Sequence, residues 1–161
     1  MTHSRRRDRG QALVEFALVI PVFLLVMVAL FDLGRAVFAY NTLTNAAREG
    51  ARMAIVNQDV ARITARAKGQ TAIVELDDPS VQIGFYQVGD GGTPDFSDPC
   101  TPAAVGCLVR VSFEATYHPI TPFVANIAFR DGVTFTATSV LSVEYSCPNA
   151  NLNAAQCPKQ P

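Results

Sequence analysis

The sequence has few of the residues, and none of the motifs, from which catalytic sites are usually built. It contains only two histidines, His3 and His118. No G-x-S-x-G, H-E-x-x-H or phosphate-binding glycine loop is present. Asp90, Asp95 and Asp98 surround a glycine-rich turn, but their spacing does not fit an EF-hand loop. We therefore expect no enzyme activity, metal, cofactor or small-molecule substrate.

Charged residues are also scarce, at 17% of the chain, and they are unevenly distributed. Residues 1–10 carry four arginines against one aspartate, a net charge of +3, so residues 11–161 carry −4. A basic cluster this short, without interleaved aromatic residues, argues against a nucleic-acid interface. It is typical of the flank that keeps one end of a membrane segment in the cytoplasm.

A long apolar run follows this basic leader. From Ala12 to Phe31 only Glu15 is charged, and a helix needs about 20 such residues to cross about 30 Å of hydrocarbon. A cleaved secretory signal would have a shorter apolar core without an acid, although Gly34-Arg35-Ala36 is a weak cleavage site. We predict a cytoplasmic leader over residues 1–10 and a retained transmembrane helix over residues 11–33.

The helical pattern continues beyond the membrane segment. A stripe on one helical face, with spacings of three and four residues, consists of Ala36, Tyr40, Leu43, Ala47, Gly50 and Ala54. Its distal members, Ala47, Gly50 and Ala54, are small, which lets another backbone or a sheet approach closely. Gly50 would cost an isolated helix about 1 kcal/mol relative to Ala, and close packing is the expected compensation. We predict an amphipathic continuation over residues 34–57 that packs on the chain's own domain, with an intermolecular coiled coil as the alternative.

The remaining residues show the alternation of β-strands. After a second predicted helix from Asp59 to about Ile73, residues 81–88 are β-like. Residues 107–117 and 133–145 alternate apolar and polar side chains, which is typical of half-buried antiparallel strands. The predicted fold class is α+β, a long N-terminal helix packed on a small antiparallel β-sheet of about three to four strands.

The segments between these strands are expected to be irregular. Asp77-Asp78-Pro79 is predicted to be a turn, and residues 89–100 are predicted to be a linker. The linker over residues 118–132 is expected to contain a short helix around Pro122–Phe129. We predict an exported domain over residues 58–147 and a loosely ordered C-terminal tail over residues 148–161.

Four cysteines lie downstream of the apolar run in two local pairs, Cys100 with Cys107 and Cys147 with Cys157. Neither pair has C-x-x-C spacing, and no histidine lies close enough to suggest a zinc site. Both loops contain proline and other turn-forming residues, which suits small disulfide-closed loops in an oxidising compartment. We predict these two disulfides; the alternative is four reduced, buried thiols.

The residues around Glu15 resemble a processing signal. A basic leader, then Gly10, then QALVEF at the start of a hydrophobic helix resembles the beginning of type IV pilin-like proteins. In those proteins a prepilin peptidase cuts after the glycine, and the fifth mature residue is glutamate; counted from Gln11, Glu15 is fifth. The string RGQALVEFALVIPVFLLVMVALFDLGRAVFAYNTLTNAAREGAR looks like the TadE family of tight-adherence (Flp) pilus systems, over about residues 9–54. Gln11 departs from the hydrophobic or aromatic first residue that pilins commonly have.

The resemblance implies a pseudopilin or minor pilin that acts by assembly. It implies cleavage between Gly10 and Gln11, and a role for Glu15 in setting the register of packed helices by pairing with the new Gln11 amine. The implied partners are the inner (cytoplasmic) membrane, a prepilin peptidase, other pilin-like subunits and pilus assembly proteins. The implied location is a single pass through the cytoplasmic membrane, N-terminus inside and domain outside, with entry into a surface pilus after processing.

Three alternatives remain open at the level of sequence. Glu15 can simply lie at the cytoplasmic interface and reach water. The chain can be an uncleaved, membrane-anchored adhesive or ligand-binding module, with its specificity in the loops over residues 89–106 and 118–132. It can also be a secreted hydrolase with a cleaved signal, which the missing catalytic motifs disfavour.

Overall fold

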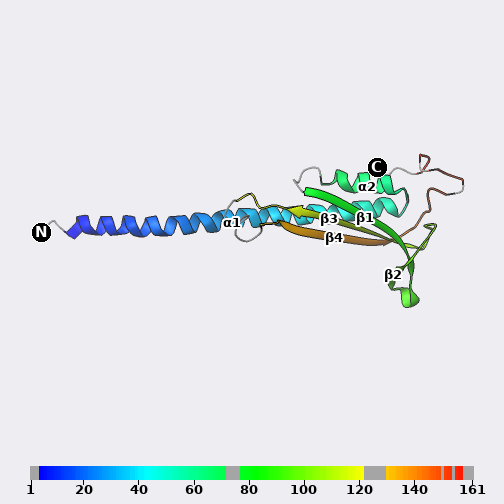
Figure 1. The fold of residues 1–161 in the computed structure, drawn as a ribbon, viewed down its shortest axis with the longest axis horizontal. Coiled ribbons are helices and arrows are strands. Elements are labelled where there is room, and N and C mark those ends of the chain that lie inside the picture. Colours follow the sequence, from blue (N-terminus) through cyan, green and yellow to red (C-terminus); the bar gives the residue numbers. More distant parts are fainter. Residues whose placement is uncertain (1–3, 72–76, 122–129, 150, 154, 158–161) are drawn as a thin grey trace.

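The computed structural model describes residues 4–71, 77–121, 130–149, 151–153 and 155–157. Figure 1 shows an elongated molecule in which the first half of helix α1 (Ser4–Ala54) projects from a domain and the second half forms part of it. The helix runs through Pro21 without interruption. At 1.5 Å per residue its 51 residues are roughly 75 Å long. Among the described residues it is the one helix long and apolar enough to cross a membrane, which indicates a single-pass membrane protein.

A second helix, α2 (Val60–Gly69), lies against the distal part of α1. It begins where the Asp59 carboxylate accepts a hydrogen bond from the Ala61 N–H at 3.0 Å, a standard N-cap that satisfies an otherwise unpaired donor. Its last turn carries Arg66 and Lys68, which suits the negative end of the helix dipole. The helix ends at Gly69, earlier than the predicted residue 73; residues 72–76 lie outside the described part of the chain.

The sheet has four strands, β1 (Asp77–Val88), β2 (Pro94–Pro99), β3 (Leu108–Tyr117) and β4 (Val133–Ser142). Their order is β2-β1-β3-β4 and every neighbouring pair is antiparallel. A short 3-10 helix, η1 (Asp90–Gly92), turns the chain between β1 and β2. The predicted α+β class and the predicted strand number are confirmed.

Two strand predictions were wrong. Asp77-Asp78-Pro79 is part of β1 and not a turn: Asp77 pairs with Thr116 and Ser80 with Glu114, with an irregular register between them. An irregularity of this kind accommodates a proline that has no N–H to donate. Residues 94–99, expected to be a linker, form β2, which lies at an edge of the sheet, the place where prolines are tolerated in strands.

The core lies between one face of the sheet and a layer made of α2 and the distal half of α1. One cluster joins Ala51 and Ala54 of α1 to Ile63 of α2 and to Val109 and Val111 of β3. The other cluster joins an earlier part of α1 to the C-terminal half of β3 and the N-terminal half of β4. It consists of Leu43, Ala46, Ala47, Ala67, Phe113, Ala115 and Ala137. The apolar face predicted for β3 is confirmed, because Val109, Val111, Phe113, Ala115 and Tyr117 are all buried. On the face predicted to be solvated, Ser112 is buried as well, and its hydroxyl is hydrogen-bonded to that of Thr138 at 3.1 Å.

The pattern predicted for β4 holds over only part of its length. Phe135 and Ala137 pack against α1, and Val143 joins the other cluster. Leu141 and Tyr145, assigned to the same face, are exposed. β4 is an edge strand, so only one of its two sides is covered by a neighbouring strand. The helix predicted around Pro122–Phe129 lies outside the described residues.

Candidate functional site

The first half of α1 projects away from the domain that the described residues form (Figure 1). Its apolar side chains from Leu13 to Phe31 are exposed or partly exposed on every side of the helix. Glu15 is also exposed, and none of the side chains that the structure describes forms an ion pair with it. Gln11 lies one helical turn before Glu15, at the i,i+4 spacing that places two residues on the same face.

The Gly10–Gln11 peptide bond is accessible on all sides. Both residues are exposed, and a Cβ added to Gly10 would meet no atom within 4 Å. The bond lies inside α1, which begins at Ser4, so the backbone of the basic leader is already helical from that residue onward. No described contact would hinder an enzyme that approaches this bond.

The distal half of α1 is covered on the side where the sequence places the small residues. Ala47, Gly50 and Ala54 are buried. A Cβ added to Gly50 would lie 3.1 Å from Val111 Cγ1 and 3.2 Å from Ala67 Cβ. Gly50 therefore lies where α1, α2 and β3 meet, and the absence of a side chain permits this close approach.

The buried face of α1 is wider than the predicted stripe. Ala39, Ala46 and Ala51 are buried as well. Ala46 and Ala51 share core clusters with residues of α2, which packs beside the sheet and covers a second strip of the helix. An ion pair between Glu49 and Arg66, at 3.4 Å, joins the two helices at the margin of this contact. The residue pattern of α1 alone does not predict that a second helix packs beside it.

Asp32 is a site residue that sequence reasoning missed. It follows the apolar run directly, yet its side chain is only 7% exposed. Its carboxylate accepts hydrogen bonds from the backbone N–H groups of Ile120, at 3.3 Å, and Thr121, at 3.2 Å. Its backbone carbonyl accepts a hydrogen bond from the Tyr117 hydroxyl at 3.3 Å. These partners lie more than 80 positions away in the sequence, so no local pattern reveals them.

Tyr117 remains a hydrogen-bond donor in this arrangement. Burial raises the pKa of its phenol, and the negative charge of Asp32 raises that pKa further, while Arg35 partly opposes the shift. The phenol is therefore neutral at physiological pH and keeps its proton for the Asp32 carbonyl. The link between α1 and the end of β3 is thus present over the ordinary pH range.

A groove opens beside this link, between α1 and the end of the sheet that is nearest to the membrane segment. Its volume is about 500 Å³. The lining is almost wholly apolar and consists of Ala29, Asp32, Leu33, Ala36, Val37, Tyr40, Tyr117, Pro119, Val133 and Phe135. Within this lining the Tyr40 and Phe135 rings meet edge-on, with their centres 5.8 Å apart.

The opposite end of α1 is fastened to the segment after β4. The last carbonyl groups of a helix lack partners within the helix; here the Ile55 carbonyl accepts hydrogen bonds from the Glu144 and Tyr145 N–H groups, each at 3.0 Å. The Gln58 side-chain amide donates to the Ala54 and Tyr145 carbonyls, both at 2.8 Å. Gln58 also exchanges hydrogen bonds with the backbone of Cys147.

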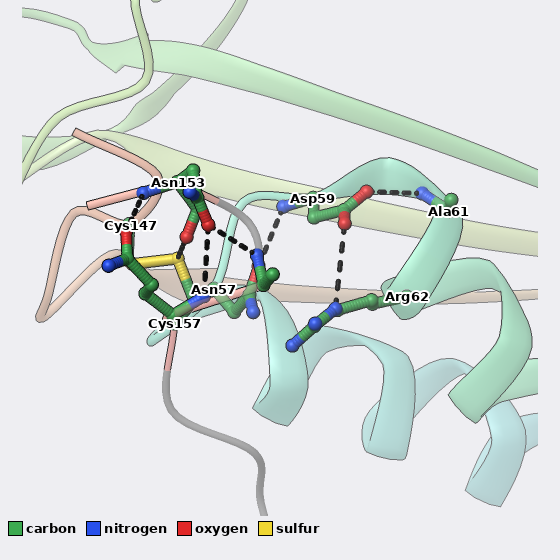
Figure 2. Close-up of polar contacts among 9 residues, drawn as sticks. Asn57, Asp59, Ala61, Arg62, Cys147, Asn153 and Cys157 are labelled. Atoms are coloured by element: carbon green, nitrogen blue, oxygen red, sulfur yellow. Dashed lines mark hydrogen bonds and ion pairs between the residues drawn. A yellow bond between two sulfur atoms is a disulfide. The ribbon is translucent and has the colours of Figure 1, made fainter. Parts of the chain in front are cut away.

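The cysteines pair as the two local loops in the sequence predict, Cys100 with Cys107 and Cys147 with Cys157. Figure 2 shows the second disulfide beside the turn between the helices, where the Asn57 side chain accepts a hydrogen bond from the Asp59 N–H at 2.9 Å. This disulfide therefore holds the C-terminal segment against the end of α1.

The loops proposed for ligand recognition are only partly described. In the 89–106 region, Phe96 of β2 packs edge-on against Tyr86 at 5.3 Å, and the Arg110 guanidinium lies 5.0 Å from the centre of the Phe96 ring. The Asp95 carboxylate accepts hydrogen bonds from the Ser97 hydroxyl and N–H, which lower its pKa. The Asp95 carboxylate thus has its partners within β2 itself, and the described residues contain no cluster of three or more potential metal ligands.

Comparison with protein families gives a match to the helix alone. The sequence model for TadE-like proteins matches residues 10–52, which confirms the resemblance seen in the sequence. The match ends before α2 and the sheet begin. No curated protein matches this chain, and no solved structure matches it. TadE-like proteins are a pilus-associated structural family.

Proposed function

We propose that this chain is a pilin-like membrane subunit, a pseudopilin or minor pilin that acts by assembly in a tight-adherence pilus or a related secretion apparatus. One observation carries the proposal. A TadE-like helix presents a long apolar surface and one acid, Glu15, for which the described side chains of the chain supply no partner. A lone carboxylate this close to hydrocarbon is costly, so a partner on another molecule, or a new one created by processing, is the expected compensation.

Processing between Gly10 and Gln11 would create such a partner. Cleavage by a prepilin peptidase removes the arginine-rich leader and leaves a positively charged amine on Gln11. This amine and the Glu15 carboxylate would pair within one chain or between adjacent helices. Attraction in a low dielectric is strong, but desolvation cancels much of it. The pair would therefore set the register of packed helices more than it would add stability.

The proposed topology follows from charge and cysteine chemistry. The arginines of the leader would remain on the cytoplasmic side, and the two disulfides would form outside, where conditions are oxidising. The domain that contains α2 and the sheet would then face the exterior and travel with the helix into any filament.

N-terminal sequencing of the mature protein, from cells that contain the cognate prepilin peptidase, tests the processing step. A start at Gln11 supports the proposal, and Gly10→Arg should then block maturation. A start at Met1 would identify an uncleaved anchor, and a start near Val37 a secreted protein. Either of these results would contradict the proposal.

Crosslinking of mature subunits in the membrane tests the role of Glu15. Glu15→Ala and Glu15→Gln should be cleaved and inserted normally, yet should give much less subunit crosslinking and filament incorporation. Gln keeps the shape but loses the charge-assisted hydrogen bond, so it should resemble Ala. Leu24→Ala, on the same helix and without a charge change, is the matched control. Wild-type crosslinking from both Glu15 variants would refute a role in register.

A further inference from the structure

The contacts between α1 and the domain determine where the domain lies along the helix axis relative to the membrane segment, which is called its height below. The apolar run from Ala12 to Phe31 has the length that a helix needs to cross the hydrocarbon. Asp32 is the next residue, so it lies at the outer boundary of that layer. Because the Asp32 carboxylate accepts hydrogen bonds from the Ile120 and Thr121 N–H groups, the loop after β3 is held at the same height.

The surface at this height is apolar. Ile120 is 58% exposed although its backbone is fastened to a buried carboxylate. Leu33 and Val37, two and six residues beyond the end of the run at Phe31, are exposed as well. The groove of about 500 Å³ between α1 and the sheet has an almost wholly apolar lining in the same region. Water is a poor solvent for this combined surface.

The charged and amphipathic residues at the height of Asp32 are of the kind that contact lipid headgroups. Arg35 is exposed, three residues beyond Asp32, and an arginine at a helix–membrane boundary can reach lipid phosphates while its stem lies along apolar surface. Tyr40 of the groove lining is 46% exposed, and tyrosine is an amphipathic residue that is enriched at membrane–water interfaces. The apolar surface is continuous with the part of α1 that spans the membrane.

We infer that the exported domain rests on the outer leaflet of the membrane that α1 spans. The loop at Ile120 and the groove between α1 and the sheet contact lipid, and Asp32 is the positioning residue that holds this loop at the bilayer surface. The inference depends on the membrane span and not on pilin-like processing or assembly. The two proposals can therefore fail independently.

A depth measurement on the full chain in liposomes tests the lipid contact. The described cysteines are all disulfide-bonded, so one new cysteine can carry a fluorescent label. Ile120→Cys is the test position and Val105→Cys, 64% exposed and at the other end of β3, is the matched control. A ten-residue strand places them roughly 30 Å apart along the sheet. Phospholipid with a spin-label quencher near its headgroup should quench the label at residue 120 several-fold more than the label at residue 105.

Two outcomes of this experiment would overturn the inference. Equal, weak quenching at both positions would place the loop in water. Weak quenching at residue 120, combined with protection from a water-soluble quencher, would show that protein covers the site, as in packing against a second copy of α1. Strong quenching at residue 120 alone supports it.

The role of Asp32 is tested in the same Ile120→Cys background. Asp32→Ala removes both acceptors and should lower lipid quenching by half or more, while Asp32→Asn, which keeps one carbonyl acceptor, should give an intermediate value. Asp59→Ala, which removes an N-cap carboxylate elsewhere in the domain, should leave the quenching unchanged. Equal quenching with and without the Asp32 carboxylate would remove its positioning role. If Asp32→Ala does not fold, Asp32→Asn and the comparison of residues 120 and 105 still decide the question.

Discussion

The two halves of α1 share one continuous backbone and have opposite surroundings. From Leu13 to Phe31 most side chains are large and apolar, and these are exposed around the helix. From Leu43 to Ala54 the buried side is mostly alanine and glycine, and it lies against β3, β4 and α2. A helix that is apolar on all sides suits lipid or other helices, whereas a small-residue face suits close contact with a sheet. Side-chain size, and not helical propensity, separates the membrane half from the domain half.

The strongest test of this difference applies one substitution to both halves of the molecule. Phe113 is fully buried in β3 under α1, and Phe23 of the membrane half is 54% exposed. Phe113→Ala should lower the free energy of unfolding of the domain by about 3–5 kcal/mol, since it leaves a cavity. Phe23→Ala should change it little. Chemical denaturation of the full chain in detergent micelles measures both, and equal losses would mean that the membrane half also packs on the domain.

Removing the C-terminal disulfide tests how the domain half is closed. The Cys147–Cys157 bridge has a sequence separation of 10 residues, which corresponds to about 2–3 kcal/mol in the chain-entropy account. Cys147→Ala combined with Cys157→Ala should lower the domain's midpoint of denaturation accordingly. Detergent-protected helicity of the membrane half should stay the same. A simultaneous loss of domain stability and of helicity in the membrane half would show that the two halves unfold as one unit.

Two glycines sharpen the comparison at the level of single atoms. A Cβ added to Gly50 would lie closer to Val111 and Ala67 than ordinary van der Waals contact allows, whereas one added to Gly34 would have no atom within 4 Å. Gly50→Leu should destabilise the domain by about 1–3 kcal/mol through overpacking. Gly34→Leu should be neutral or slightly favourable, because leucine is the better helix former. Thermal melting compares the two, and an unchanged melting temperature for Gly50→Leu would contradict the close contact with β3.

The smallest expected effect concerns the two glutamates of α1. Glu49 pairs with Arg52 at 3.3 Å and with Arg66 at 3.4 Å, both at partly exposed positions. Glu49→Gln should lower the domain's stability by roughly 0.2–1 kcal/mol, and high salt should abolish that difference. Glu15→Gln should leave the domain's stability unchanged at any salt concentration. A loss from Glu15→Gln would mean that Glu15 has a partner within the chain.

The sequence was sufficient to predict features that depend on local periodicity. Helical spacing indicated α1 and the small face at Ala47, Gly50 and Ala54, and alternation indicated β3. It was insufficient where contacts between distant segments decide the conformation. β2 was missed because prolines and aspartates are poor strand formers, and only its place at the sheet edge makes them acceptable.

The same limit applies to the candidate site. Gly10, Gln11 and Glu15 stand out through their order and spacing alone. Asp32 does not stand out, because its role depends on hydrogen bonds from the backbone amides of residues 120 and 121. In the sequence it was indistinguishable from a polar residue that simply ends an apolar run. An acid at the boundary of a membrane segment is worth testing for such distant backbone partners.

The unbroken course of α1 through the membrane half into the sheet has a mechanical consequence. Helix α1 has 51 residues and continues through Pro21, a residue that removes one internal hydrogen bond and clashes with the carbonyl four positions earlier, so the two halves form one rod in this structure. A thrust applied near Gln11 would therefore arrive at Leu43 as a movement of nearly equal length. There α1 packs against Phe113 and Ala137, so the domain would move with the helix. A displacement of the membrane end along the helix axis would thus move the domain by a similar distance.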